Sequence, residues 1–258
     1  MRSVMAVMNE AEPHEDDCHL QPQRRSREDD AGRESWLVFV PALQPLVWEL
    51  DPQGAAAFLL RCAPDQRQRA QALFDYSVAP DSLICNTPFA ALDLLPADRS
   101  LDALDGFLRA LDRRKRLAKL TASLRTRYDR VILDCPPVLN EVSDQVFRAV
   151  DVLIIPLSPS PLARRALDDV RGHLARTFKK HPPILPVFTM VDRRRALHRA
   201  ALEQQPDWPV IPMASQMEQV AVRRAPLGSF DRTSSAAKAV TALWSGIERK
   251  LVETPDAL

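Results

Sequence analysis

Polar side chains stand directly after several short apolar runs of this sequence, and their types suit phosphate chemistry. They are Asp51, Asp134, Ser158, Ser160 and Asp192. Two carboxylates at neighbouring strand ends would suit a hydrated Mg²⁺ beside a phosphate chain, because Mg²⁺ takes oxygen ligands and keeps several waters. A carboxylate near a terminal phosphate can also orient an attacking water. The alternative is that each aspartate caps the helix that follows it, and for any single aspartate capping is the better explanation.

The elements that must position these side chains alternate along the chain. We expect strands at residues 3–9, 46–50, 131–133, 152–156, 184–190 and 210–212, and helices at 55–62, 65–74, 101–125, 142–150, 162–178, 192–204 and 236–252. Continuous apolar strands separated by amphipathic helices indicate a parallel sheet covered on both faces. The sequence therefore predicts one α/β domain over residues 1–258, with a doubly wound, mostly parallel sheet whose ligands lie beyond the carboxyl ends of the strands.

Composition favours a soluble, cytoplasmic chain. Of the 258 residues, 46% are apolar and 27% charged, and the net charge of +1 argues against a general polyanion binder. No apolar run approaches the roughly 20 residues that span a bilayer, and the start lacks the order of a signal peptide. The four cysteines form no C-x-x-C pair, so we expect them to be reduced. They are Cys18, Cys62, Cys85 and Cys135.

The strand-end motifs resemble those of the ParA/MinD group of P-loop ATPases. Residues 46–54 read L-V-W-E-L-D-P-Q-G and resemble the group's D-x-D-P-Q-G motif, with Glu49 where the first aspartate usually stands. Residues 128–137 read Y-D-R-V-I-L-D-C-P-P and resemble its Walker B stretch. Further segments resemble the group in order and spacing, so that the resemblance covers about residues 46–251 and implies a P-loop NTPase-like fold. Those segments are 92–97, 149–160, 188–199 and 210–228.

The resemblance assigns roles position by position. Asp51 matches the switch I aspartate implicated in hydrolysis, and Asp134 matches the Walker B aspartate, so both would hold Mg²⁺, in part through water. Positions implied in nucleotide binding are Asp134, Pro136, Pro137, Thr189, Ala225 and Pro226. Positions near those that present basic side chains to DNA are Arg193, Arg195, Arg223 and Arg224. For the arginines, a solvated face of an exposed helix is the commoner alternative.

The resemblance also implies cofactors and partners. Members bind ATP and Mg²⁺, form homodimers, bind DNA non-specifically and respond to a ParB-like partner protein during chromosome or plasmid partition. We therefore expect a bacterial, cytoplasmic, nucleoid-associated protein without an integral membrane segment. One alternative is a non-catalytic ParA-like scaffold or regulator that binds DNA or protein. A MinD-like membrane regulator is disfavoured, because the chain ends in E-T-P-D-A-L instead of a basic amphipathic tail.

The phosphate-binding loop of the group is missing from its expected place. Asn9 is followed by Glu10-Ala11-Glu12-Pro13 where the group has K-G-G-x-G-K-T-T, and no glycine of the chain precedes a lysine. That loop wraps phosphates with backbone N–H groups, and its lysine neutralises them. We interpret residues 10–45 as an aberrant, poorly ordered segment that replaces the Walker A loop and first helix. ATP binding is therefore expected to be impaired.

A shifted reading frame offers one explanation. Back-translation of residues 13–23, read from the second base of each codon, permits T-K-T-T-A-T-C-N-L-S, and family members commonly read G-K-T-T-x-A-x-N-L-A there. We hypothesise that residues 10 to about 46 derive from such a frame. The rival is a relative that keeps the fold and has lost catalysis. The cluster His14-Glu15-Asp16-Asp17-Cys18-His19 matches no standard zinc spacing and is given little weight.

Overall fold

An eight-stranded, mostly parallel sheet forms the centre of the molecule, with the strand order β3-β4-β2-β5-β1-β6-β7-β8. Strand β1 (Ser3–Met8) pairs in parallel with β5 (Arg130–Cys135) on one side and with β6 (Val152–Leu157) on the other. Because strands are added on both sides of β1, the sheet is doubly wound. The computed structural model describes residues 2–8, 44–63, 69–110 and 115–253.

The other elements follow the expected alternation. The remaining strands are β2 (Pro45–Glu49), β3 (Cys85–Asn86), β4 (Asp93–Leu95), β7 (Ile184–Val191) and β8 (Val210–Pro212). The α-helices are α2 (Ala55–Leu59), α3 (Leu104–Ala110), α4 (Arg116–Leu124), α5 (Glu141–Phe147), α6 (Pro161–Thr177), α7 (Ala196–Gln204), α8 (Ser215–Arg223), α9 (Leu227–Phe230) and α10 (Ser235–Glu253). Short 3-10 helices are η1 (Ala70–Leu73), η2 (Pro80–Ser82) and η3 (Arg99–Ala103). Among the strands in the described part of the chain, only β3 runs antiparallel to its neighbour, which is β4.

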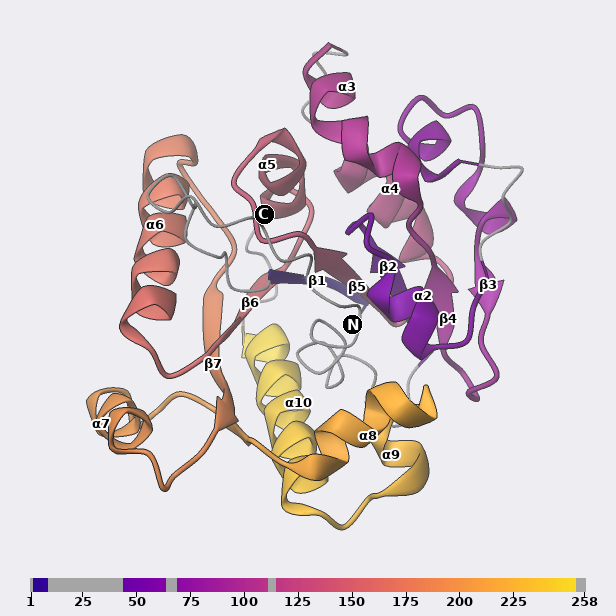
Figure 1. Ribbon diagram of the computed structural model, residues 1–258. Coiled ribbons are helices and arrows are strands. Elements are labelled where there is room, and N and C mark those ends of the chain that lie inside the picture. Colours follow the sequence, from indigo (N-terminus) through magenta and orange to yellow (C-terminus); the bar gives the residue numbers. More distant parts are fainter. Residues whose placement is uncertain (1, 9–43, 64–68, 111–114, 254–258) are drawn as a thin grey trace, which may run out of the picture.

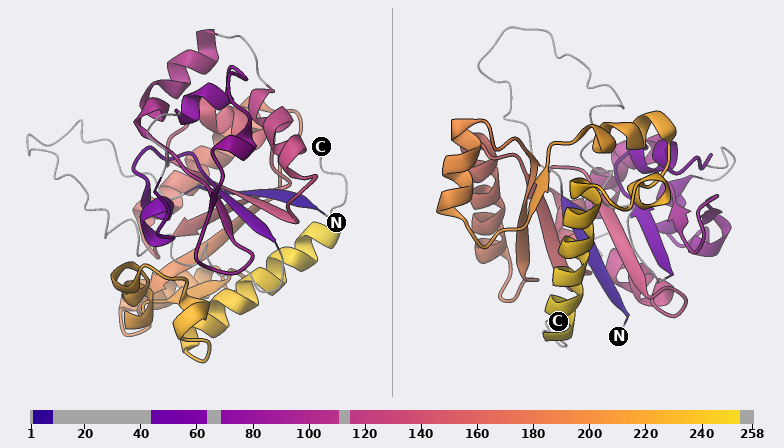
Figure 2. Two further views of the ribbon diagram at one scale, coloured as in Figure 1. Left: turned by 90° about the vertical axis from the view of Figure 1, so that its right-hand side faces the viewer. Right: turned by 90° about the horizontal axis from the view of Figure 1, so that it is seen from below.

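Helices cover both faces of the sheet and enclose two hydrophobic cores. Figure 1 shows α3 to α6 along one face and α8 to α10 along the other, and Figure 2 shows the same layers from two further sides. Within β1, Val4 and Ala6 belong to the core under α3 to α6, whereas Met5 and Val7 belong to the core under α8 to α10. Burial on both faces explains why these strands read as continuous apolar runs, and it confirms the predicted fold class.

The prediction of a single helix over residues 101–125 is wrong. The structure has η3 and α3 up to Ala110 and a separate helix α4 that begins at Arg116, after Lys115 with the non-helical angles φ −125° and ψ 22°. The leucine spacing continues across the break because Leu104, Leu108 and the leucines of α4 all face the same core. Periodicity reports which core a segment faces, and it does not require one helix to carry the whole pattern.

Two further helix predictions begin too early. In place of a helix over 65–74, the described part of that range contains η1, whose first N–H groups donate to side chains distant in sequence. Ala70 N donates to Asp98 at 2.7 Å, and Gln71 N donates to Ser100 at 3.0 Å. Helix α7 begins at Ala196 instead of Asp192, because the Asp192 carboxylate accepts the Arg194 N–H at 3.0 Å and forms a turn. The sequence patterns also missed β3, β4, α8 and α9.

The expectation of fully reduced cysteines is wrong for one pair. The structure joins Cys62, just beyond α2, to Cys85 in β3, with their Cα atoms 6.3 Å apart. The two residues are 23 positions apart in sequence and meet because the segment after α2 folds back to the edge of the sheet. Cys135 is a buried free thiol, and Cys18 lies outside the described residues.

The predicted aberrant segment 10–45 falls almost wholly outside the described residues, which resume at residue 44. Pro45 already belongs to β2, so the boundary lies slightly earlier than predicted. In the described ranges, no helix combines the length and apolar character needed to cross a membrane.

Candidate functional site

Asp134 lies at the carboxyl end of β5, in the middle of the sheet. Its strand neighbours in register are Val7 of β1 and Glu49 of β2. The residue is 1% exposed, so its carboxylate lies at the end of a buried strand and not on an open surface. The backbone also joins this position to the next strand, because Leu50 N donates to the Asp134 carbonyl at 2.8 Å. The strand-end argument therefore placed Asp134 correctly.

Asp51 lies on the turn that follows β2. Its Oδ1 accepts the Gln53 N–H at 2.9 Å, and its carbonyl accepts the Gly54 N–H at 3.2 Å. Gly54 has φ +71°, a left-handed conformation that glycine adopts without strain, and α2 starts at the next residue. The turn leaves Asp51 partly exposed at the edge where β5 also ends. A carboxylate on this turn can therefore reach ligands above the sheet.

The thiol of Cys135 indicates that the two aspartates share one electrostatic environment. Burial raises the pKa of Cys135 well above its usual range, and the negative charges of Asp134 and Asp51 raise it further. Both carboxylates are therefore close enough to act on the same buried atom. Within the described ranges, no group of three or more His, Cys, Asp or Glu side chains could hold a metal by itself. Two carboxylates fit a Mg²⁺ ion that completes its shell with water and phosphate oxygens.

Glu49 is the functional residue whose role the sequence did not reveal. It is fully buried, and its Oε1 accepts the N–H groups of Ala56 at 2.6 Å and Ala57 at 3.4 Å, at the start of α2. Its Oε2 accepts Ala97 N at 3.2 Å, just beyond β4. Burial raises the pKa of Glu49 to about 7 against these three hydrogen bonds, which favour the charged form. The carboxylate thus ties the start of α2, which follows the turn that carries Asp51, to the segment after β4.

The double proline after β5 forms the next turn of this edge. Val138 N donates to the Pro136 carbonyl at 2.9 Å, and the turn ends where Asn140 caps α5 in a capping box with Ser143. Pro137 stands within this turn, between Asp134 and the exposed Val138. The double proline, whose two residues the resemblance implied in nucleotide binding, therefore begins a turn that the Asn140 cap closes at the start of α5.

The three other positions implied in nucleotide binding, Thr189, Ala225 and Pro226, are buried in two separate segments. Thr189 is 7% exposed within β7, next to Met190, whose φ of +56° accompanies a register shift against β8. Ala225 and Pro226 are buried where α8 passes into α9, and Ala225 N donates to the Val220 carbonyl at 3.3 Å. Within the described residues, no hydrogen bond joins Thr189 to this segment.

The four arginines predicted near DNA differ in their contacts. Arg193 and Arg195 are exposed on the turn before α7. The Arg224 guanidinium instead donates to the Phe58 carbonyl at 2.8 Å and lies over the Phe58 ring. Arg223 lies over the Phe230 ring, with 4.8 Å from its guanidinium carbon to the ring centroid. The first pair is available to a partner in solution, whereas the second pair also packs α8 against its neighbours.

The two serines that follow β6 are part of the start of α6. Ser160 is the N-cap of α6, and its hydroxyl accepts the Ala163 N–H at 3.1 Å. The Ser158 hydroxyl lies 3.3 Å from that of Ser160. Asp192, at the end of β7, is held by Arg194, whose hydrogen bonds lower the pKa of Asp192 to about 2. Ser160 and Asp192 therefore accept N–H groups of local turns, and Ser158 contacts the Ser160 cap, whereas Asp51 and Asp134 form the candidate site.

Comparison with known proteins identifies the family. A family model described as an AAA domain matches residues 41–183, more than half of the chain. The chain is also similar to the chromosome partitioning protein ParA of Caulobacter vibrioides, with 29% identity over 162 residues. That match covers 59% of this chain and 60% of the ParA protein.

Solved structures with low sequence identity share the fold. The septum site-determining protein MinD from Pyrococcus horikoshii, complexed with Mg-ADP, gives a TM-score of 0.70 at 16% identity and covers 96% of both chains. Cobyrinic acid a,c-diamide synthase from Mycobacterium smegmatis, with bound ATP analogue and magnesium, gives a TM-score of 0.71 at 22% identity. It covers 100% of this chain and 98% of its own. The chain therefore belongs to this AAA-domain family, as a member of the ParA/MinD group of P-loop ATPases.

Proposed function

We propose that the chain is a ParA-type partition protein. In this proposal its homodimer binds non-specific DNA, uses Mg²⁺ and ATP to switch between states, and responds to a ParB-like partner in a bacterial, nucleoid-associated cytoplasmic setting. The observation that carries the proposal is the position of Asp51 and Asp134 at one edge of the sheet, where β1 ends. This is the place at which a loop after β1 would present a phosphate chain.

In this proposal the residues at this edge of the sheet have different roles. When bound, Mg²⁺ supplies the positive charge that stabilises a phosphate chain. Asp134, buried at the strand end, would hold the ion in part through water, and Asp51 on its exposed turn would orient the attacking water. The double proline would form the turn beside the phosphates. The residues proposed to surround the purine are Thr189, Ala225 and Pro226, and those proposed to face DNA are Arg193, Arg195, Arg223 and Arg224.

A second candidate function follows from the missing loop. The sequence after β1 carries no G-K-T or G-K-S, so the chain as printed lacks the lysine and hydroxyl that hold phosphates and Mg²⁺ in this group. We therefore propose that nucleotide binding by this chain is impaired. A member that keeps the fold without binding ATP would serve as a scaffold or regulator that binds DNA or protein.

Binding assays on two versions of the protein distinguish these functions. One is the chain as printed, and the other carries residues 10–45 replaced by the peptide that the shifted frame of its gene encodes. Fluorescence of an ATP analogue with Mg²⁺ measures nucleotide binding, and retention on unrelated DNA with and without ATP measures the switch. The partition proposal expects both activities in the replaced chain and neither in the printed one. If the gene encodes no phosphate loop in either other frame, and the printed chain binds DNA without ATP, the scaffold function holds.

A further inference from the structure

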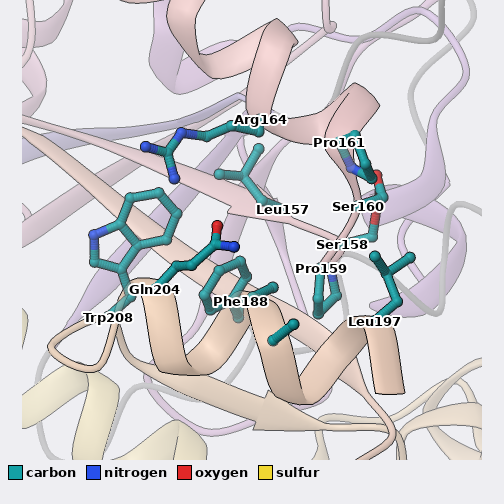
Figure 3. Close-up of a pocket in the computed structure, with 12 residues that line it drawn as sticks. Leu157, Ser158, Pro159, Ser160, Pro161, Arg164, Phe188, Leu197, Gln204 and Trp208 are labelled. Carbon is teal, nitrogen blue, oxygen red and sulfur yellow. Dashed lines mark hydrogen bonds between the residues drawn. The ribbon is translucent and has the colours of Figure 1, made fainter. Parts of the chain in front are cut away.

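A cavity of about 280 Å³ lies between α6 and α7, away from the carboxylate site. Leu157, the last residue of β6, and its strand neighbour Phe188, within β7, form its floor, and Leu197 forms part of the α7 wall (Figure 3). Leu197 is 50% exposed, which leaves an apolar wall open to solvent. The residues that line the cavity do not include Asp51 or Asp134. The cavity is therefore separate from the two carboxylates.

An aromatic surface closes one end of this cavity. The rings of Phe188 and Trp208 pack with centroids 4.9 Å apart and an interplanar angle of 43°. In Figure 3, Trp208 lies at the end opposite Pro159 and Leu197, and the Gln204 side chain reaches up from α7 between them. A planar ring can lie against this surface, because flat apolar groups gain the most contact against aromatic walls.

A cation stands at the same aromatic end. The Arg164 guanidinium lies over Trp208, with 5.6 Å from its central carbon to the ring centroid. Within the described residues, the carboxylate near it is Asp168, at 3.9 Å, which is too long for a hydrogen bond. The donors of Arg164 are therefore available to an anion held over the aromatic surface. Arg165, the next residue, is exposed and lines no part of the cavity.

We propose that this cavity binds a small planar aromatic carboxylate. The ring would lie against Phe188 and Trp208, and the carboxylate would accept hydrogen bonds from Arg164, with Gln204 as a second donor. The volume accommodates one or two fused rings, and an apolar lining with a few polar groups is typical of small-molecule sites. Arginine suits the anion because its fork of N–H groups matches both carboxylate oxygens.

The matched probes are 2-naphthoate and its uncharged counterpart 2-naphthamide, titrated calorimetrically into the whole chain. We expect 2-naphthoate to bind with one site per chain and more tightly than the amide. Arg164→Ala should weaken 2-naphthoate about tenfold or more, the usual value of a hydrogen bond to a charged group, and should leave 2-naphthamide unchanged. Arg165→Ala, which removes the same charge from the neighbouring position, should change neither affinity.

Two variants test the location. Ala201→Phe fills the cavity and should abolish binding of both probes, and Leu197→Asp places a negative charge on its exposed rim and should selectively weaken 2-naphthoate. Circular dichroism and thermal melting check that each variant is folded. If the Ala201→Phe chain does not fold, Leu197→Asp, at an exposed position, still tests the location. The proposal is overturned if 2-naphthoate does not bind at millimolar concentration, if Arg164→Ala and Arg165→Ala weaken it equally, or if folded Ala201→Phe and Leu197→Asp chains bind as wild type does.

Discussion

Replacing Glu49 by glutamine should change how the stability of the chain depends on pH. The unfolded chain ionises this carboxyl group near its ordinary pKa of 4.5, whereas burial raises the pKa in the folded chain to about 7. Between these two pH values the folded state binds more protons than the unfolded state, so the free energy of unfolding falls as the pH rises. Below the lower value and above the upper one, Glu49 contributes no slope.

The size of the effect follows from these two pKa values. At about 1.4 kcal/mol for each pH unit, the contribution of Glu49 falls by about 3 kcal/mol between pH 4.5 and 7. Glutamine has nearly the same shape and does not titrate. Its carbonyl can still accept the N–H groups of Ala56 and Ala57, while its NH₂ group faces the Ala97 N–H. We expect a cost of about 1–3 kcal/mol from that lost acceptor, the same at every pH.

Urea unfolding at pH 4.5, 5.5, 6.5 and 7.5, with EDTA present, measures the difference in stability between wild type and Glu49→Gln. The advantage of the wild type should shrink by about 3 kcal/mol across this range. Glu203→Gln, at an exposed position of α7, is the matched control and should give a constant difference. An advantage that stays flat or grows with pH would refute the reasoning, because it would mean that the three backbone hydrogen bonds outweigh burial.

Three further predictions concern other parts of the chain. In a chain with a restored phosphate loop, Asp51→Ala should lower phosphate release about a hundredfold and leave binding of an ATP analogue nearly unchanged, and equal loss of both would contradict its proposed role. Without reductant, Cys62→Ser should lower the urea-unfolding free energy by about 3 kcal/mol by removing the bond to Cys85, and the difference should vanish in dithiothreitol. Arg130→Met should cost about 2 kcal/mol by removing the hydrogen-bonded partner of Glu248, measured by thermal melting, whereas changing both residues to methionine should recover part of the loss.

The sequence predicted the central sheet and its carboxylates because both depend on local patterns. A buried parallel strand reads as an apolar run, and the residue after it must lie at the carboxyl edge, so Asp51 and Asp134 could be located without coordinates. The comparisons then confirmed the family and the fold class. The same strand-end rule also selected Ser160 and Asp192, and it could not show that these side chains cap local turns.

The rest depends on contacts between distant segments. In the sequence, Glu49 was visible only as a residue that replaces the usual first aspartate of a family motif. Its function rests on the N–H groups that it accepts, which lie seven, eight and 48 positions later in the chain. Predicting the Cys62–Cys85 bond would require knowing that Cys62, just beyond α2, lies beside β3 at the edge of the sheet. The cavity beside Trp208 forms only where α6 and α7 pack together, and no spacing of residues indicates it. The roles of the nucleotide and DNA positions stay predictions.

The position of β1 has a consequence for synthesis of the chain. Among the described strands β1 comes first along the chain, yet its partners are residues 130–135 and 152–154. At about 5–20 residues per second, a ribosome needs on the order of ten seconds to produce them. Throughout that interval the six residues of β1 have no strand to pair with. Because β1 lies between β5 and β6, the strands on its two sides cannot join into one sheet without it. Strand β1 therefore reaches its native pairing only after β5 and β6 have been made, and its apolar side chains stay uncovered until then.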